Sequence, residues 1–94
     1  MTPLQLKFTQ NAFKHGVSED EIWEVFLNRD LPCVIIQYKT NGVERIYNAY
    51  GVTDSGRYLV IGFVKETEDT YRIIHAMNMK ESARKRYKKM RKLK

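Results

Sequence analysis

The residue types most suited to chemistry in this chain are its two histidines, His15 and His75, and three arginines in or beside strand-like runs, Arg45, Arg57 and Arg72. Histidine takes or gives a proton near neutral pH, and arginine binds phosphate through paired N–H groups. Cleavage of RNA without a metal needs a base for the ribose 2′-hydroxyl, an acid for the leaving oxygen and fixed cations around the phosphate. These residues could supply that chemistry if folding brings them together.

Two more residues could join such a site, Lys14 as a cation and Tyr87 as an acid. Most of the candidates also have a structural interpretation. A histidine can pack or cap a helix, a tyrosine can belong to the core, and a strand arginine can protect a sheet edge from aggregation. The sequence leaves both interpretations open for His15, His75, Tyr87, Arg45 and Arg57.

Positive charge is concentrated at the C-terminus. Residues 80–94 hold nine Lys or Arg and one Glu, a net charge of +8, whereas the first 79 residues carry −2. Such a segment attracts polyanions, either nucleic acid or an acidic protein segment. Arg84, Lys85 and Lys88 are its candidate RNA-binding residues. A solvated helix that only aids solubility would have the same composition.

Several classes of site are excluded by the sequence. With two histidines sixty positions apart and one cysteine, Cys33, it has no CxxC, HxxxH or HExxH spacing and no internal disulfide. Phosphate-loop and dinucleotide signatures are absent, so we expect neither a metal nor a cofactor. No apolar run approaches the roughly 20 residues of a membrane helix, and the N-terminus lacks a signal-peptide pattern. We expect a cytoplasmic protein that does not bind membranes.

The N-terminal residues predict a first helix over 4–15. Leu4, Phe8 and Ala12 recur at helical spacing. Gly16 follows where a left-handed residue commonly ends a helix.

A second helix is expected to begin after Ser18. Glu21 stands three residues later, which is the spacing of a capping box. The helix should end near Arg29, because Pro32 follows within three residues.

Four strand-like runs come after Pro32, namely CVIIQYK, ERIYNAYGV, RYLVIGFVK and TYRIIHAM. Short polar connections separate them, beginning with the hairpin signal Asn41-Gly42. We therefore expect one α+β domain over residues 1–94. In it, two N-terminal helices pack on a four-stranded antiparallel meander, and residues 79–94 form a basic C-terminal helix.

Strand alternation bears on the last run. It places His75 on the same side as Ile73 and Met77 and opposite Arg72. A site that uses both His75 and Arg72 therefore requires a β-bulge between them.

The order of several motifs resembles a known family. KHGVS follows a Lys and an Asn, and after it come ERIYNAYGVTDSGRYLVIGF, YRIIHAM and a Tyr ten residues later. This order resembles the BrnT family of type II toxin–antitoxin ribonucleases, which share a RelE-like fold. The similarity runs from residue 7 to about residue 87. The matching residues are Val25 and Phe26 at the end of an acidic helix and Gly51, Thr53, Gly56 and Arg57 in a Gly-x-Thr-x-x-Gly-Arg turn.

The resemblance implies a cytoplasmic bacterial toxin that inhibits translation by cleaving RNA without a metal. Its partners would be RNA and a small DNA-binding antitoxin that also represses the operon, and the toxin would act as a homo-oligomer or in a toxin–antitoxin complex. By position, the family's functional motifs fall on Lys14, His15, Arg45, Arg57, Arg72 and Tyr87. The alternatives are a non-catalytic RNA- or protein-binding module on the same fold, or a regulatory protein whose basic helix contacts DNA.

Two features depart from the family pattern. Family members begin with a short strand that ends in an aromatic residue and an Asp, whereas Pro3 and Leu4 stand here, so we expect this strand to be missing or reduced. The RIISAR-like motif reads RIIHAM, so His75 replaces a Ser and Met77 replaces an Arg. The second change removes one cation from the expected RNA surface.

Overall fold

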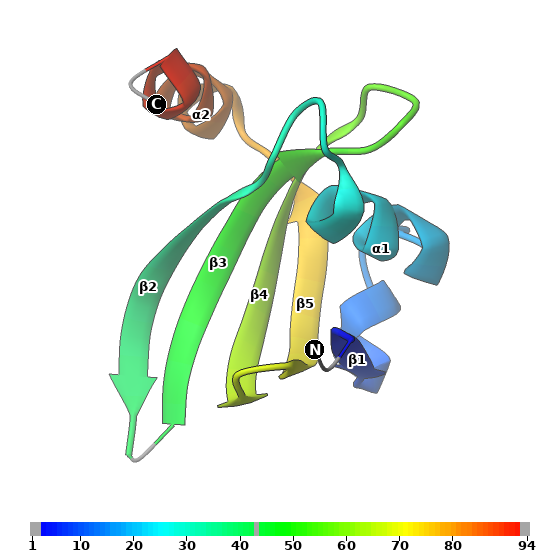
Figure 1. The fold of residues 1–94 in the computed structure, drawn as a ribbon, viewed down its shortest axis with the longest axis vertical. Helices are drawn as coiled ribbons and strands as arrows, with labels where there is room; N and C mark the ends of the chain where they lie inside the picture. The colour runs from blue at the N-terminus through cyan, green and yellow to red at the C-terminus, as the bar shows by residue number, and fades with distance from the viewer. Residues whose placement is uncertain (1–2, 43, 93–94) are drawn as a thin grey trace.

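The computed structural model describes residues 3–42 and 44–92, and the side chains of all of these except residues 38–41 and 92. They form a small α+β domain with a five-stranded mixed sheet and two α-helices (Figure 1). In chain order the elements are β1 (Gln5–Phe8), the 3-10 helix η1 (Gln10–Phe13), α1 (Glu19–Leu27), β2 (Val34–Asn41), β3 (Glu44–Val52), β4 (Tyr58–Thr67), β5 (Thr70–Asn78) and α2 (Glu81–Lys92).

The order of strands in the sheet is β1-β5-β4-β3-β2. The consecutive strands β2 to β5 are antiparallel neighbours, and β2 joins β3 through Gly42, which has a φ of +66°. β1 pairs in parallel with β5, from Gln5 opposite Thr70 to Phe8 opposite Ile73. The sheet is therefore mixed, with β1 and β2 at its two edges.

The expected arrangement of two N-terminal helices on a four-stranded antiparallel sheet is wrong. Residues 4–15 contain β1 and the single turn η1 instead of a helix. The backbone N–H of Gln5 donates to the carbonyl of Asp69 at 2.7 Å, and the Thr9 N–H donates to Ile73 at 3.2 Å. Pairing with the free edge of β5 therefore satisfies backbone groups that an isolated helix of this length would hold only weakly.

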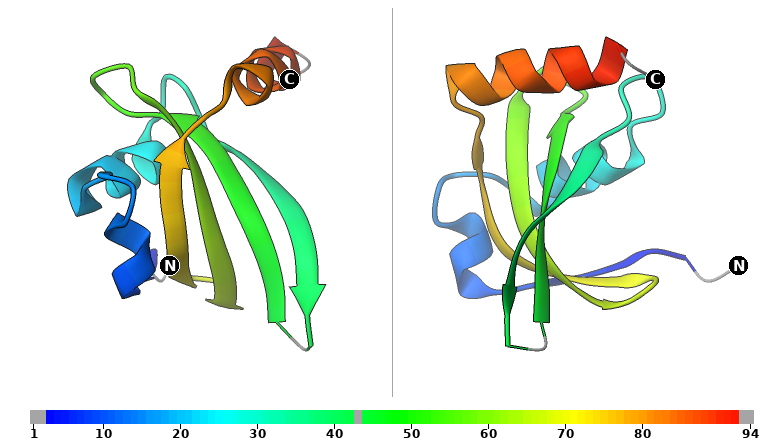
Figure 2. Two further views of the ribbon diagram at one scale, coloured as in Figure 1. Left: turned by 180° about the vertical axis from the view of Figure 1, so that it is seen from behind. Right: turned by 90° about the vertical axis from the view of Figure 1, so that its left-hand side faces the viewer.

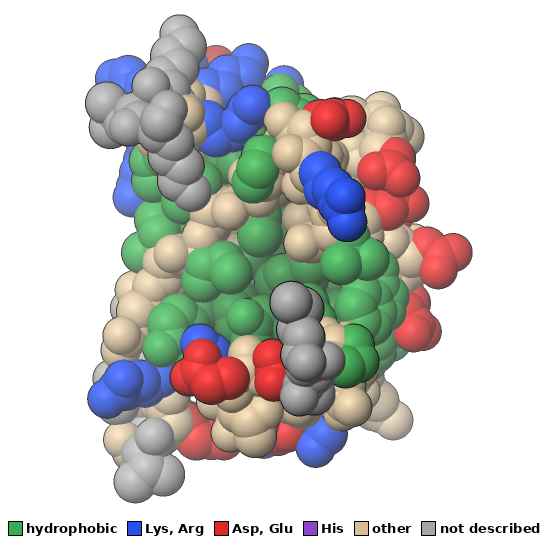
Figure 3. Space-filling model, in the orientation of Figure 1, with side chains coloured by type: hydrophobic (Ala, Val, Ile, Leu, Met, Phe, Trp, Pro, Cys, Tyr) green, Lys and Arg blue, Asp and Glu red, His purple; other side chains and the backbone are tan. Residues whose placement is uncertain are grey.

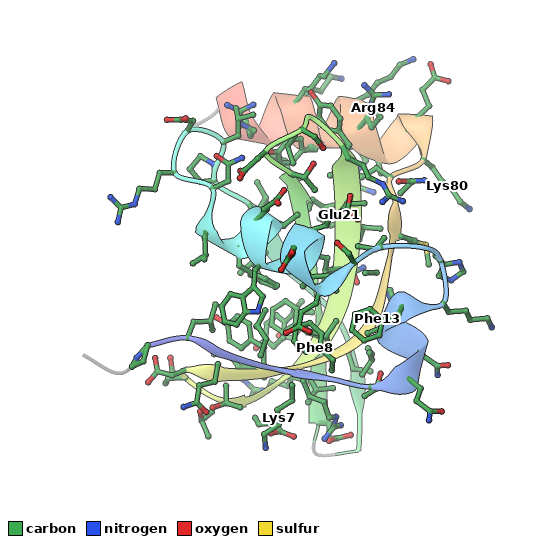
Figure 4. All side chains as sticks on the ribbon, turned by 90° about the vertical axis from the view of Figure 1, so that its right-hand side faces the viewer. Lys7, Phe8, Phe13, Glu21, Lys80 and Arg84 are labelled. Carbon is green, nitrogen blue, oxygen red and sulfur yellow. The ribbon has the colours of Figure 1, made fainter. Side chains whose placement is uncertain are left out.

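Side chains of β1 follow the two-residue period of a strand. Leu6 and Phe8 are half-buried and pack against the core, whereas Gln5 and Lys7 are exposed. Figure 4 shows Phe8 pointing toward α1, Lys7 pointing away from it, and Phe13 beside Phe8, with 5.6 Å between the two ring centroids. The first strand that we expected to be missing or reduced is present, and it ends in an aromatic residue.

The capping box expected at the start of α1 is confirmed. The Ser18 side chain accepts from the Glu21 backbone N–H at 3.2 Å, and the Glu21 carboxylate accepts from the Ser18 N–H at 3.0 Å. The helix ends at Leu27, close to the expected boundary, and buries Ile22 and Val25 against the sheet.

Two hydrophobic cores lie on opposite faces of the sheet. On the face that α1 covers, which we call the α1 face, Phe63 lies at the centre of an aromatic cluster, 4.5 Å from the ring of Tyr71 and 5.6 Å from that of Phe26. On the other face, α2 lies across the end of the sheet where β3 and β5 finish (Figure 2) and buries Tyr87 with Val52. Each helix thus covers part of one face.

Among residues 3–42 and 44–92, no helix has the length and the apolar composition needed to cross a membrane.

Candidate functional site

The face of the sheet opposite α1 carries a row of cross-strand neighbours with polar members. We call it the open face, because α2 covers only one end of it. The strand pairings place His75 of β5 beside Gly62 of β4, Gly62 beside Asn48 of β3, and Asn48 beside Ile36 of β2. Side chains of paired residues point to the same face. His75 and Asn48 are therefore two strands apart on one surface.

A β-bulge in β5 changes the pattern that simple alternation predicts. The pairing of β4 with β5 passes from Gly62 opposite His75 to Phe63 opposite Ile73, so Ile74 is an extra residue in β5. An extra residue reverses the alternation beyond it. Arg72 and His75 therefore share the open face, and the bulge that a joint site requires is present.

The imidazole of His75 lies directly on the backbone of Gly62. A Cβ atom added to Gly62 would come within 2.3 Å of His75 Cε1 and within 2.5 Å of Nε2, so any side chain there would displace the ring. Burial lowers the pKa of His75 below its ordinary value, and the charge of His15 lowers this pKa further. The neutral form of His75, which can accept a proton, is favoured near neutral pH.

The fold brings His15 close enough to β5 for its charge to affect His75. β1 pairs with β5 only as far as Ile73, and η1 then packs against β5. The loop after η1, which carries the exposed His15, runs on from there toward Arg57. His15 is near enough to this strand for its charge to lower the pKa of His75.

Arg57 connects the segments that carry the two histidines. Its Nη1 donates to the Gly16 carbonyl at 3.3 Å, and its Nε donates to Asn78 Oδ1 at 2.8 Å. The same Nη1 lies 3.0 Å from both carboxylate oxygens of Glu21 in the capping box of α1. The backbone hydrogen bond from Ser18, followed by the one from Arg57, lowers the pKa of Glu21. Arg57 therefore holds three elements in place.

Arg72 belongs to an ion-pair network at the other end of the open face. Its guanidinium lies 2.8 Å from Glu44 and 3.0 Å from Glu66, and Glu66 also binds Lys7 at 2.8 Å. The hydrogen bond from Lys7 is the main reason for the lowered pKa of Glu66, and Arg72 lowers it as well. Two carboxylates thus compensate the charge that was expected to bind phosphate.

Tyr87 is fully buried beneath α2 and does not reach the open part of the sheet. Its ring lies edge-on to Tyr58 at 6.1 Å, and its hydroxyl is 3.5 Å from the Pro32 carbonyl oxygen. Burial raises its pKa. The structure therefore favours a core role for Tyr87 over that of an acid.

The other sequence candidates are spread over the surface. Lys14 lies beside His15, whereas Arg45 lies on β3 at a position whose side chain points to the α1 face, away from His75. On α2, the guanidinium of Arg84 lies 4.4 Å from the Tyr58 ring centre and Lys88 lies 5.6 Å from it, while Lys85 is 3.7 Å from Glu81. Figure 3 shows basic side chains at the end of the molecule where α2 lies and acidic ones on the side of α1. Arg45 and Arg72 line one hollow of about 600 Å³ together with Glu44 and Glu66, whereas Arg57 is not part of it, so the three arginines do not form one pocket.

Sequence reasoning missed five residues, four on the open face and one on α2. Asn48, Tyr50 and Arg86 line a hollow together with Ile36, and Gly62 allows His75 to lie flat on the sheet. A glycine inside a strand often marks the close approach of another group, so Gly62 carried a usable signal. Asn48 and Arg86 had none, because only the pairing of β3 with its neighbours and the placement of α2 bring them together.

This arrangement places an imidazole with a lowered pKa on β5 and an amide beside a hollow at the centre of the open face. In the part of the chain that the structure describes, no group of three His, Cys, Asp or Glu side chains is placed to hold a metal ion.

No protein-family model matches this chain, and no curated protein matches it. The resemblance to the BrnT family therefore stays a prediction that depends on the motifs of the sequence.

Proposed function

We propose that this chain is a metal-independent endoribonuclease, the toxin of a type II toxin–antitoxin pair similar to the BrnT family. In this proposal His75 is the general base and His15 is the general acid. Lys14 and the basic residues of α2 attract the RNA, and Arg57 is a positioning residue. The toxin would act in the cytoplasm, where a small DNA-binding antitoxin neutralises it.

One observation carries the proposal. The chain has two histidines, sixty positions apart, and His15 is near enough to His75 for its charge to lower the pKa of His75. A base and an acid are the two groups that metal-free RNA cleavage needs. The lowered pKa of His75 suits the base, because a base must be unprotonated at the working pH.

The reaction would proceed in one displacement. His75 takes the proton of a ribose 2′-hydroxyl, and the 2′-oxygen attacks the adjacent phosphorus. The bond from phosphorus to the 5′-oxygen breaks, and protonated His15 gives its proton to that oxygen. The products are a 2′,3′-cyclic phosphate and a 5′-hydroxyl, and Lys14, next to His15, stabilises the negative charge on the phosphate.

Arg57 supports this chemistry through its contacts with Gly16 and Asn78. Gly16 adjoins His15, and Asn78 lies three residues after His75 in β5. A side chain that fixes both segments keeps the acid and the base at a constant separation. Such alignment accounts for much of the rate of a catalysed reaction.

A second function is favoured by a different observation. Arg57 and Arg72 are both paired with carboxylates, so they offer less positive charge to a phosphate than sequence reasoning expected. This favours a non-catalytic module that binds RNA or protein through α2. Such a module would bind RNA in a salt-dependent way and leave it intact.

The test is cleavage of RNA by the purified protein in excess EDTA, with the chemical ends of the products identified. We expect cleavage that leaves 2′,3′-cyclic phosphates, and a loss of about 10²- to 10⁴-fold in His75→Ala and in His15→Ala. Arg29→Met, which removes an exposed cation from the loop after α1, is the matched control and should cleave normally.

Two results would overturn the mechanism: activity that disappears with EDTA, or activity that survives both histidine changes. Intact RNA together with salt-sensitive binding would establish the non-catalytic module instead. Expression in a bacterial host tests the biological role, because a toxin should arrest growth and the product of an adjacent reading frame should relieve the arrest.

A further inference from the structure

A hollow of about 280 Å³ lies on the open face where α2 approaches the sheet. Ile36, Asn48 and Tyr50 of the sheet and Arg86 of α2 line it. A flat ring system such as a nucleobase fits within this volume. The lining combines an aliphatic side chain, an aromatic ring, an amide and a guanidinium.

The amide of Asn48 is incompletely satisfied. Its Nδ2 donates to the Tyr50 hydroxyl at 3.5 Å, the long limit of a hydrogen bond. Its Oδ1 is shielded from solvent and accepts no hydrogen bond from the residues that the structure describes. A buried polar atom without a partner is unfavourable and needs an explanation. Asn48 lines the hollow, so a turn of its amide would bring this oxygen to a ligand that supplies a donor.

The hollow lies about the length of one nucleotide from His75, the proposed general base. Asn48 and His75 are on opposite sides of Gly62 in one cross-strand row. Neighbouring strands are about 4.8 Å apart, so the two backbones are separated by about 10 Å. The imidazole of His75 lies over Gly62 of β4, the strand between β5 and β3. A nucleobase bound in the hollow would therefore place the sugar and phosphate of its own nucleotide next to His75.

We propose that this hollow is a base-specificity subsite that binds adenine of the RNA substrate. This subsite rests on the proposed function, which makes RNA the ligand. The terminal torsion of asparagine is broad, so the Asn48 amide can turn its oxygen into the hollow. An asparagine amide pairs with adenine at two points, accepting from the N6 amine and donating to N7.

The other lining residues fit the same ligand. Guanine offers two acceptors at the corresponding edge and leaves the Asn48 oxygen without a donor. The larger ring system of a purine covers more of Ile36 and Tyr50 than a pyrimidine does, and bases stack on tyrosine rings. Arg86, which is exposed on α2, is placed to contact the phosphate or to lie against the base.

The experiment measures binding of adenosine, guanosine, cytidine and uridine 3′-monophosphates to the full chain by NMR titration. These probes contain no internucleotide bond and cannot be cleaved, so binding is measured apart from catalysis. We expect adenosine monophosphate to bind at least about five-fold more tightly than uridine monophosphate, with shifts centred on Asn48, Tyr50 and Ile36.

Asn48→Leu is the decisive variant, because it keeps the side-chain size and removes the amide. We expect it to abolish the preference for adenine and to unfold at a higher temperature than the wild type, since it removes a buried unsatisfied atom. Tyr50→Phe is the matched control. It keeps the ring, removes only the hydroxyl that Asn48 contacts, and should retain the preference.

The two proposals fail in different ways. Adenine binding that depends on Asn48 in a protein that cleaves no RNA would support the subsite and overturn the endoribonuclease. Equal binding of the four nucleotides, or a preference that persists in Asn48→Leu, would overturn the subsite. RNA cleavage that shows no bias toward adenosine would count against it as well.

Discussion

The two faces of the sheet differ in what their side chains do. On the α1 face, Phe63 packs among Phe26, Tyr47 and Tyr71 under a helix whose first turn is acidic. On the open face, a polar row crosses the strands, and a basic helix covers only one end. The side chains of the α1 face pack against one another. On the open face, by contrast, burial lowers the pKa of His75, and Asn48 Oδ1 has no hydrogen-bond partner among the described residues.

Two glycines of the sheet, one on each face, show this difference in what surrounds them. Gly51 in β3 faces α1, and an added Cβ would come within 2.6 Å of Val25 Cγ1 and 3.1 Å of Cys33 Cβ. Gly62 in β4 faces the open side, and the three atoms nearest to an added Cβ would all belong to the His75 ring. The first glycine permits close packing of a helix on the sheet, and the second permits the placement of a functional side chain. A substitution on the α1 face should therefore mainly change stability, whereas one on the open face should mainly change activity.

The largest expected effect is on cleavage by Gly62→Ala. The new methyl group would push the His75 ring off the sheet, and a misplacement of about 1 Å reduces rates by roughly 10²-fold. We expect a loss of that size in kcat/KM for RNA, with the protein still folded by circular dichroism. Normal cleavage by Gly62→Ala would show that the position of His75 on this glycine is irrelevant to activity.

Gly51→Ala should show the reverse behaviour. Overpacking against Val25 and Cys33 should lower the free energy of unfolding by about 1–3 kcal/mol, measured in urea. The fraction that remains folded should cleave RNA at the wild-type rate, because Gly51 lies on the other face from His75. A large loss of activity per folded molecule would contradict the separation of the two faces.

Arg57→Met should affect both properties to an intermediate extent, since this side chain joins α1 to β5. We expect a loss of about 1–2 kcal/mol in stability from the hydrogen bonds to Glu21, Gly16 and Asn78. We also expect cleavage to fall by roughly ten-fold through misalignment of the histidine segments. A fall in kcat with unchanged KM would support positioning, whereas a rise in KM alone would indicate direct binding of the phosphate.

The pH dependence of stability should identify His75. Its folded-state pKa lies below the ordinary value of 6.5, so the unfolded chain takes up the proton first as the pH falls. This contribution is present above pH 6.5 and is lost as the pH falls below it toward the folded pKa. Urea unfolding at pH 7.5 and at pH 5 should show a loss of stability that is smaller in His75→Gln. An equal loss in both proteins would place the effect elsewhere.

Tyr87→Phe should have the smallest effect. The hydroxyl lies 3.5 Å from the Pro32 carbonyl, so its removal should change stability by less than about 1 kcal/mol. Cleavage should be unaffected, because the ring is buried under α2. A loss of activity comparable to that of His75→Ala would restore the catalytic role that the sequence pattern suggested for Tyr87.

The parts of the fold that depend on near neighbours were predictable from the sequence. The capping box of Ser18 and Glu21 joins residues three positions apart, and the hairpin at Gly42 depends on one backbone conformation. The error over residues 4–15 arose because Leu4, Phe8 and Ala12 fit a helical period, while the alternation of Leu6 and Phe8 fits a strand. Only the partner strand β5 decides between the two.

The candidate site was partly predictable, because the residue types pointed to RNA chemistry but their positions did not follow from the sequence. His15 and His75 were chosen for their chemistry. The pairing of β1 with β5 brings the segment that leads to His15 beside β5, and the extra residue Ile74 places His75 on the same face as Arg72. The part that Arg57 plays in holding two segments was hidden for the same reason, since Gly16 and Asn78 are distant in the chain.

By itself the sequence determined the four antiparallel strands, the capped helix α1 and the basic character of the C-terminal segment. Each of these depends on residue preferences and hydrogen bonds within a few positions, which the order of residues specifies directly. Only the tertiary structure decided the parallel edge strand β1, the face on which His75 lies and the neighbours of Asn48. Those features depend on the register between strands far apart in the chain, and a shift of one residue in that register moves a side chain from one face to the other.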